Sequence, residues 1–125
     1  AAFMSANLNE SHEIALMEVG EEAPGVQNRQ VGLNHMAWRM STLDDLKEFY
    51  VRLKDKGISS EAHDHGISIG IYFKDPDGNG IEVYYESPRE TWHRQENIFM
   101  HGDSPKGQFP GPWDEVTVDH VIGSR

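Results

Sequence analysis

Apolar and polar residues alternate along two stretches of the chain that flank the segment DPDGNG. The first stretch covers residues 67–74 and the second covers residues 80–86. Alternation with a period of two predicts β-strands that bury one face. In the segment between them, proline restricts φ, and Gly78 and Gly80 can take the positive φ that tight turns require. The pattern therefore predicts a β-hairpin over residues 65–86.

The two faces of this hairpin differ in character. One face is apolar and suits a protein core, and it consists of Ile67, Ile69, Ile71, Phe73, Ile81, Val83 and Tyr85. The other face carries Tyr72 and Glu82 among small or polar neighbours. We therefore expect packing on the first face and chemistry on the second.

A spacing of three and four residues replaces the alternation over residues 42–56. The apolar positions form one stripe, which consists of Leu43, Leu46, Phe49, Tyr50 and Leu53. This stripe predicts an amphipathic helix. Ser41 or Thr42 can cap its start, and Gly57 can end it.

The segments on either side of the helix complete a β-α-β-β-β order. Residues 31–40 alternate and predict a strand that places His35 opposite its bulky apolar residues. Residues 58–63 predict a short strand or an extended connector. The expected fold class is α+β.

The N-terminal residues look like a partial copy of the central hairpin. Residues 1–6 and 12–19 predict two strands around a turn, followed by a connector over residues 20–30. Aligning the phenylalanine of each first strand places His12 on Glu82, nine residues later in both segments. We therefore expect the second half of one β-α-β-β-β module, followed by a complete second module.

Composition narrows the classes of function. The 125 residues include 11 Lys and Arg against 21 Asp and Glu, with a net charge of −10. Such a surface repels nucleic acid and anionic membranes. The absence of cysteine excludes disulfide and thiolate chemistry, and no apolar run approaches the roughly 20 residues that cross a bilayer. We expect one domain in the cytoplasm, with no nucleic-acid or membrane partner.

Three side chains are candidates for a metal site. His35 and Glu82 fall on the same predicted face of paired strands, and His12 occupies the place of Glu82 in the partial repeat. Two histidines and a carboxylate are the ligand set of non-haem Fe(II) sites and also suit Zn, Ni or Mn. A single histidine in a strand is more often a structural residue, however, and a single glutamate is usually solvated. The residues alone leave both interpretations open.

The segments GLNHMAWRM and YFKDPDGNGIEVYYE, with the capped helix between them, resemble the vicinal oxygen chelate superfamily. This superfamily includes glyoxalase I, bleomycin-resistance proteins and type I extradiol dioxygenases. The resemblance implies βαβββ modules whose curved mixed sheet surrounds a divalent metal, with His35 and Glu82 as ligands. The third ligand, a histidine on the first strand of the first module, has no counterpart in this sequence. Either the sequence is truncated, or another chain supplies the strand, or the metal site is incomplete.

The resemblance also implies a division of the chain. A vicinal oxygen chelate domain would cover residues 1–92, with half of module 1 at residues 1–20 and module 2 at residues 31–86. Residues 93–125 would form an extended C-terminal arm. Since the first strand and helix of module 1 are missing, the sheet would have an unpaired edge, and we expect a homodimer.

Three further residues resemble the extradiol dioxygenase branch. His12, in SHEIALM, matches a histidine that serves these enzymes in acid–base catalysis, and His65 and Tyr72 look like their substrate-contacting residues. A catechol loses protons when it chelates iron and regains one as its ring opens, which a histidine can mediate. A phenol can stabilise developing oxyanion charge.

The remaining histidines carry weaker expectations. By themselves, His63 and His65 form a His-x-His pair that could bind a metal, but beside Asp64 in a loop we expect them to be solvated. The other histidines are expected at the surface, and they are His93, His101 and His120.

Three functions are therefore open. The leading one is an Fe(II)-dependent extradiol dioxygenase acting on a catechol-like aromatic. The second is a glyoxalase-like lyase or isomerase with a carbonyl substrate and a Zn, Ni or similar centre, in which His12 is a ligand or unimportant. The third is a metal-free protein that sequesters a small ligand in the same cup.

Overall fold

The computed structural model describes residues 1–65 and 67–91, and the expected arm with its three histidines lies outside them. In chain order the elements are β1 (Ala2–Met4), β2 (Ile14–Leu16), β3 (Met36–Arg39), α1 (Leu43–Asp55), β4 (Ser60–Asp64), β5 (Ser68–Lys74), β6 (Gly80–Glu86) and the 3₁₀ helix η1 (Arg89–Thr91). The predicted β-α-β-β-β order is confirmed from β3 to β6. The strand expected over residues 31–40 is shorter, because only β3 pairs with the sheet.

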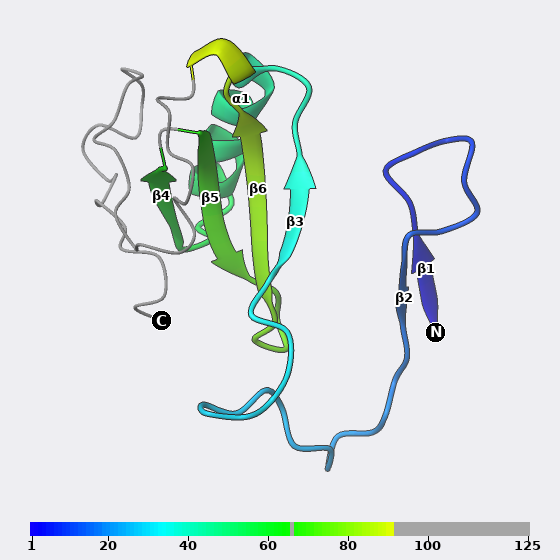
Figure 1. Cartoon of the computed structure of the whole chain (residues 1–125). Helices are drawn as coiled ribbons and strands as arrows, with labels where there is room; N and C mark the ends of the chain where they lie inside the picture. Colours follow the sequence, from blue (N-terminus) through cyan, green and yellow to red (C-terminus); the bar gives the residue numbers. More distant parts are fainter. Residues whose placement is uncertain (66, 92–125) are drawn as a thin grey trace.

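The strands β3 to β6 form one curved mixed sheet with the order β3-β6-β5-β4 (Figure 1). β6 runs parallel to β3 and antiparallel to β5, and β5 runs antiparallel to β4. A parallel pair needs a crossover connection, which α1 begins and β4 and β5 complete. The expected α+β class with a curved mixed sheet is confirmed.

The core lies between α1 and one face of the sheet. Its buried residues are Leu46, Tyr50, Leu53, Ala62, Ile69, Ile71 and Val83. Trp38, Phe73, Ile81 and Tyr85 are half-buried and pack against this cluster. The hairpin face predicted to be apolar is therefore the core face. The opposite face of the hairpin carries Tyr72 and Glu82.

Local signals set the limits of α1. The Thr42 hydroxyl accepts a hydrogen bond from the Asp45 amide, and the Asp45 carboxylate accepts one from the Thr42 amide, each at 3.1 Å. This reciprocal capping box satisfies two donors at the helix start. Gly57 follows the helix with φ at 68°, in the left-handed region that suits glycine.

The turn between β5 and β6 is built on Asp75. Its Oδ1 accepts hydrogen bonds from the amides of Asp77 at 3.0 Å and Asn79 at 2.8 Å, and its Oδ2 accepts one from the Asn79 side chain at 2.8 Å. Burial raises the pKa of the Asp75 carboxyl, but these hydrogen bonds outweigh it and hold the pKa below its usual value. Gly78 takes a positive φ of 91°.

Gly80 serves a different purpose from the one expected. It does not adopt positive φ. A Cβ at this position would instead collide with the backbone oxygen of Asn34 and lie 3.2 Å from the Cβ of His35. Glycine therefore lets the segment before β3 pass close to the start of β6, which brings His35 to the sheet.

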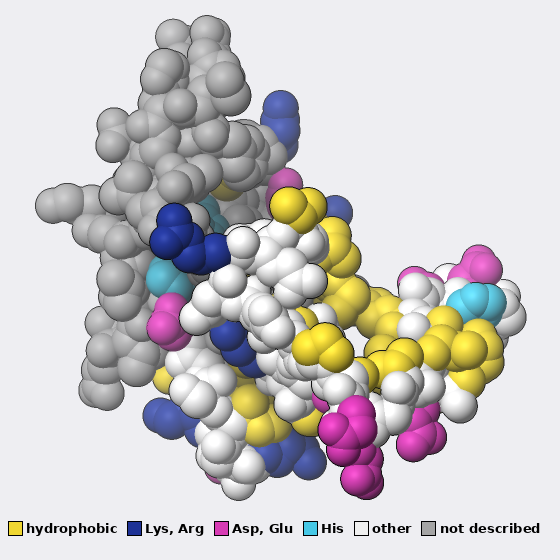
Figure 2. All heavy atoms as spheres, turned by 90° about the horizontal axis from the view of Figure 1, so that it is seen from below, with side chains coloured by type: hydrophobic (Ala, Val, Ile, Leu, Met, Phe, Trp, Pro, Cys, Tyr) yellow, Lys and Arg dark blue, Asp and Glu magenta, His cyan; other side chains and the backbone are white. Residues whose placement is uncertain are grey.

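The strands β1 and β2 form a separate antiparallel pair. Figure 1 shows this pair standing apart from the four-stranded sheet. In Figure 2, hydrophobic side chains lie on the surface of the pair. Phe3 is 61% exposed and Leu16 is 47% exposed. Within the described residues, no helix is long and apolar enough to cross a membrane.

Candidate metal and catalytic site

The sheet face opposite α1 carries polar side chains on β4, β5 and β6, and His35, which precedes β3, reaches this face at Glu82. The strand register places Glu82 of β6 beside Tyr72 of β5 on one side and beside Ala37 of β3 on the other. On β4, Glu61 is the partner of Tyr72. Because register partners point to the same face, these side chains lie in one row across the sheet.

His35 and Glu82 face each other directly. The Nε2 atom of His35 lies 3.0 Å from Oε2 of Glu82. The other ring nitrogen, Nδ1, lies 2.6 Å from Oδ1 of Asn34. Since an amide oxygen can only accept, Nδ1 carries the hydrogen, and Nε2 of the neutral ring presents a lone pair to the carboxylate.

Two lone pairs at this distance need a cation between them, either a proton or a metal ion. Two donors that each lie about 2.1 Å from a metal, at a right angle, are about 3.0 Å apart. The observed separation of the His35 and Glu82 donor atoms therefore fits two adjacent ligand positions on a divalent metal. Asn34 acts as the orienting partner that metal-binding histidines commonly have.

Further ligands are not gathered at this pair. Within residues 1–65 and 67–91, no group of three or more His, Cys, Asp or Glu side chains is placed to hold a metal ion. The ligand roles expected for His35 and Glu82 therefore stay a prediction, and the described residues place no third His, Cys, Asp or Glu beside this pair to complete a metal-binding group.

Tyr72 connects the carboxylate to a second histidine. Its hydroxyl donates to Oε1 of Glu82 at 2.6 Å, and Nε2 of His65 lies 3.0 Å from the same hydroxyl oxygen. A phenol has one proton, which is used toward Glu82, so the Tyr72 oxygen must accept from His65. The His65 ring consequently carries a hydrogen on Nε2 and directs it toward the site.

Gly70 makes room for this arrangement. A Cβ built on Gly70 would collide with Oε1 of Glu82 and lie 3.0 Å from Cε2 of Tyr72. Glu82 is buried in this position, with 7% of the residue exposed. The missing side chain at Gly70 therefore lets a buried carboxylate lie flat over β5.

The expectation that His63 and His65 form a solvated loop pair was wrong. His63, Asp64 and His65 are 4%, 2% and 7% exposed, and the first two belong to β4. The His63 ring lies parallel to that of His65, with centroids 6.1 Å apart, and edge-on to Tyr72 at 5.2 Å. The available signal was the alternation of Glu61, His63 and His65, which continues a strand pattern through the predicted loop.

His12 is the candidate that the structure does not bring to this row. It is exposed on the segment between β1 and β2. Its ring meets Phe3 edge-on at 5.2 Å, and its Nδ1 lies 3.0 Å from the hydroxyl of Ser11. The acid–base role expected for His12 stays a prediction.

A hollow of about 1330 Å³ borders the row of polar residues. Its wall includes His35, Tyr72 and Glu61, together with apolar side chains of the connector before β3 and of β2. Its lining combines apolar side chains with a few polar groups, as small-molecule sites do.

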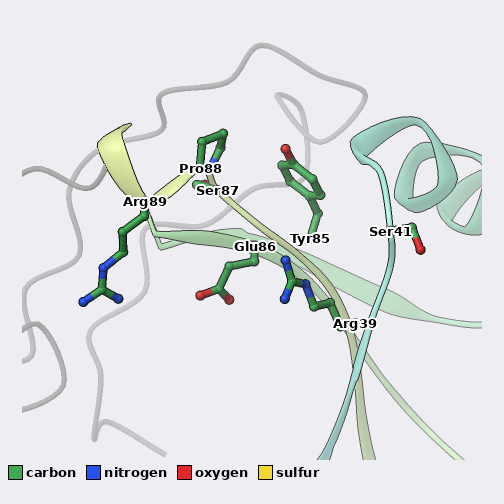
Figure 3. Close-up of a pocket in the computed structure, with 7 residues that line it drawn as sticks. All are labelled: Arg39, Ser41, Tyr85, Glu86, Ser87, Pro88 and Arg89. Carbon is green, nitrogen blue, oxygen red and sulfur yellow. The ribbon is translucent and has the colours of Figure 1, made fainter.

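A second hollow, of about 350 Å³, lies at the other end of β6. Figure 3 shows Glu86 between the side chains of Arg39 and Arg89 in this hollow. None of the residues expected to act in chemistry lines it, so the larger hollow is the better candidate for a substrate site.

Comparison with known proteins adds family evidence. Residues 3–83 match the family model of the Glyoxalase/Bleomycin resistance protein/Dioxygenase superfamily. The chain is 34% identical over 110 residues to biphenyl-2,3-diol 1,2-dioxygenase 3 of Rhodococcus globerulus, covering 82% of this chain and 54% of that protein. No solved structure matches the chain significantly.

Two further relatives carry similar names. Catechol-2,3-dioxygenase of Bacillus subtilis (strain 168) is 38% identical over 82 residues, which are 65% of this chain and 29% of that protein. Biphenyl-2,3-diol 1,2-dioxygenase 2 of Rhodococcus globerulus is 33% identical over 120 residues, which are 92% of this chain and 60% of that protein. The chain therefore matches at most about three-fifths of the length of these relatives.

Proposed function

The chain belongs to the glyoxalase/bleomycin resistance protein/dioxygenase superfamily, and we propose that it serves extradiol ring cleavage of a catechol-like aromatic. In this reaction the ring bond next to a hydroxyl-bearing carbon breaks, and both atoms of O₂ enter the product. The observation that carries the proposal is the approach of His35 Nε2 to Glu82 Oε2 at 3.0 Å, with Glu82 hydrogen-bonded to Tyr72 and Tyr72 to His65. The names of the relatives support the same chemistry.

The proposed ligands are His35 through Nε2 and Glu82 through Oε2. When bound, Fe(II) would supply chelation of the two diol oxygens and electron exchange with O₂. Asn34 and Tyr72 hold the two ligand side chains in their observed orientations through hydrogen bonds at 2.6 Å each. Zn, Ni or Mn would suit the same two donors, and we propose Fe(II) because the relatives are dioxygenases.

The remaining residues of the row handle protons. The His65 Nε2–H group donates a hydrogen bond to the Tyr72 hydroxyl oxygen. If a substrate oxygen binds where this hydroxyl oxygen lies, His65 holds a proton within reach of it. The Tyr72 hydroxyl can turn from Glu82 to a substrate oxygen that gains negative charge. His12 is proposed as a further acid–base group.

Four finer points are also proposals. The active form would be a homodimer, and residues 1–92 would form the vicinal oxygen chelate domain, followed by an arm over residues 93–125. The cytoplasmic location stays a prediction from composition. The substrate would be a small aromatic diol rather than the carbonyl compound of a glyoxalase-like lyase.

Metal content measured beside turnover tests the proposal. His35→Ala and Glu82→Ala should each lose bound iron and ring cleavage, because each removes a donor atom of the pair. His12→Ala should keep the iron and lose about 10²–10⁴ in turnover, the usual span for an acid–base group. Tyr72→Phe should keep the iron with a smaller loss, since only one hydroxyl is removed.

The glyoxalase-like alternative predicts the opposite pattern. There His12→Ala would release metal in step with activity, and Tyr72→Phe would behave like the wild type. That pattern would refute the dioxygenase proposal, whereas ring cleavage that survives Glu82→Ala would refute the assignment of Glu82 as a metal ligand. A wild type that binds small aromatics but no metal would instead support the sequestering protein.

A further inference from the structure

Glu61 is a charged residue beside the candidate site. The proposed ring cleavage gives Glu61 no role. It is the register partner of Tyr72 on β4, so it lies in line with Tyr72 and Glu82 across the sheet. Its side chain is 72% exposed, and it lines the large hollow together with His35 and Tyr72. An exposed glutamate is negatively charged at neutral pH, so a molecule in the hollow meets an anionic group.

The Glu61 carboxylate is held by a buried residue. Its Oε2 lies 3.3 Å from Nε2 of His63, which donates because an ionised carboxylate can only accept. His63 is 4% exposed and packs against His65 and Tyr72. This contact restrains a side chain that would otherwise move freely in water, and it keeps the charge close to the row.

The position of Glu61 in the sheet determines which part of a bound molecule would lie near its carboxylate. Strands in a sheet lie about 4.8 Å apart, and β5 separates Glu61 on β4 from Glu82 on β6. A ring held at Glu82 with a substituent that extends over Tyr72 therefore brings that substituent next to the Glu61 carboxylate. The other charged groups that line the hollow belong to the connector and to the end of the β5–β6 hairpin, and they are Arg29, Lys74 and Asp75.

We propose that Glu61, held by His63, selects among substrates by charge. The site favours aromatic diols whose ring substituent is cationic, accepts neutral ones and disfavours those with a carboxylate. The physical reason is the Coulomb interaction between the substituent and Glu61, which acts as a repulsive element against the wrong substrate. The inference rests on the proposed function, because it assumes that the diol oxygens are held at His35 and Glu82.

The test compares three ligands with the iron-loaded full chain: catechol, a catechol with a 2-aminoethyl group and a catechol with a carboxymethyl group at the same ring position. Relative to catechol, Glu61→Gln should raise kcat/KM for the carboxymethyl compound about 4- to 20-fold and lower it similarly for the aminoethyl compound. Added salt should shrink both differences in the wild type. His63→Gln should weaken the discrimination without abolishing it.

Glu48→Gln is the matched control. Glu48 is 71% exposed on α1, so this variant makes the same change in net charge on the opposite side of the sheet. It should leave the ranking of the three compounds unchanged. An equal effect of Glu48→Gln and Glu61→Gln would show that only the net charge matters and would overturn the proposal.

The outcome separates this inference from the proposed function. If catechol is cleaved but Glu61→Gln changes all three compounds equally, the charge selection is wrong and the ring-cleaving function stands. If catechol is not cleaved, calorimetric binding of the same three compounds still measures the preference, and a wild type without the expected order of affinities refutes it.

Discussion

At the residue scale, the candidate site depends on which side chains are missing as much as on those present. The Glu82 carboxylate can face His35 only because Gly70 beneath it lacks a Cβ. The row His65, Tyr72 and Glu82 then has a single direction of donation, from imidazole to phenol to carboxylate. These features place the free lone pairs of His35 and Glu82 toward each other.

Gly70→Ala should weaken metal binding while the fold persists. The added methyl group collides with Oε1 of Glu82 and moves the carboxylate away from His35. A tenfold to hundredfold loss of metal affinity, on the order of the effects of disturbing ligand orientation, is expected in competition with a chelator. Gly32→Ala is the control, because a Cβ at Gly32 meets no atom within 4 Å. Equal affinities for both variants would contradict this account of Gly70.

At the scale of elements, the β5–β6 hairpin is the frame of the site. Its register places Tyr72 opposite Glu82, and a slip of either strand by one residue would turn the side chain of that strand to the core face. The turn that holds the register is organised by the Asp75 carboxylate, which accepts hydrogen bonds from Asp77 and Asn79. The stability of the hairpin is therefore tied to the charge of one residue.

Acid should remove the contribution of Asp75 to stability. Its pKa is lowered in the folded chain, so the fold favours the ionised carboxyl. The stabilisation is complete above the unfolded pKa, which is about 3.9 for aspartate, and is lost as the pH falls through the lower folded pKa. Urea unfolding between pH 7 and pH 2.5 should show wild type and Asp75→Asn converging below about pH 4.

Asp77→Asn serves as the comparison for Asp75→Asn. The structure assigns the backbone amide of Asp77, rather than its carboxylate, to the turn. This variant should therefore follow the wild type across the pH range. A constant difference between wild type and Asp75→Asn at every pH would mean that the Asp75 charge does not hold the turn.

At the scale of the whole molecule, the β1–β2 pair is notable because it is a two-stranded sheet with exposed apolar side chains. Two-stranded hairpins are marginally stable on their own in water. This pair exposes Phe3, Met4 and Leu16 and is joined to the sheet by the connector before β3 (Figure 1). Contact with a second copy of the chain would cover these apolar side chains.

Phe3→Asp should shift the proposed dimer toward monomer. A charge in an apolar contact is costly unless it is paired, so the mass of the full chain in solution at micromolar concentration should fall from that of a dimer. Asn9→Asp adds the same charge in the turn of the hairpin and should leave the dimer intact. A wild type that is monomeric under these conditions would refute the homodimer.

The sequence by itself determined the features that depend on neighbouring residues. The cap at Thr42, the stripe of α1 and the turn of the β5–β6 hairpin involve side chains and amides within a few positions, and these were predicted, whereas the reciprocal hydrogen bond to the Asp45 carboxylate was not. The alternation along β5 and β6 likewise assigned Tyr72 and Glu82 to one face, because strand geometry sends successive side chains to opposite sides.

Only the tertiary structure decided features that join distant segments. His63 was expected in solvent, and it is buried because β4 pairs with β5 and places its ring against Tyr72. Gly80 was expected to adopt the positive φ of a turn. Instead, its missing side chain leaves room for the backbone at Asn34 and His35, about 45 residues away in sequence. Burial and close approach depend on which strands become neighbours, and that choice is made by the packing of the whole chain rather than by any local pattern.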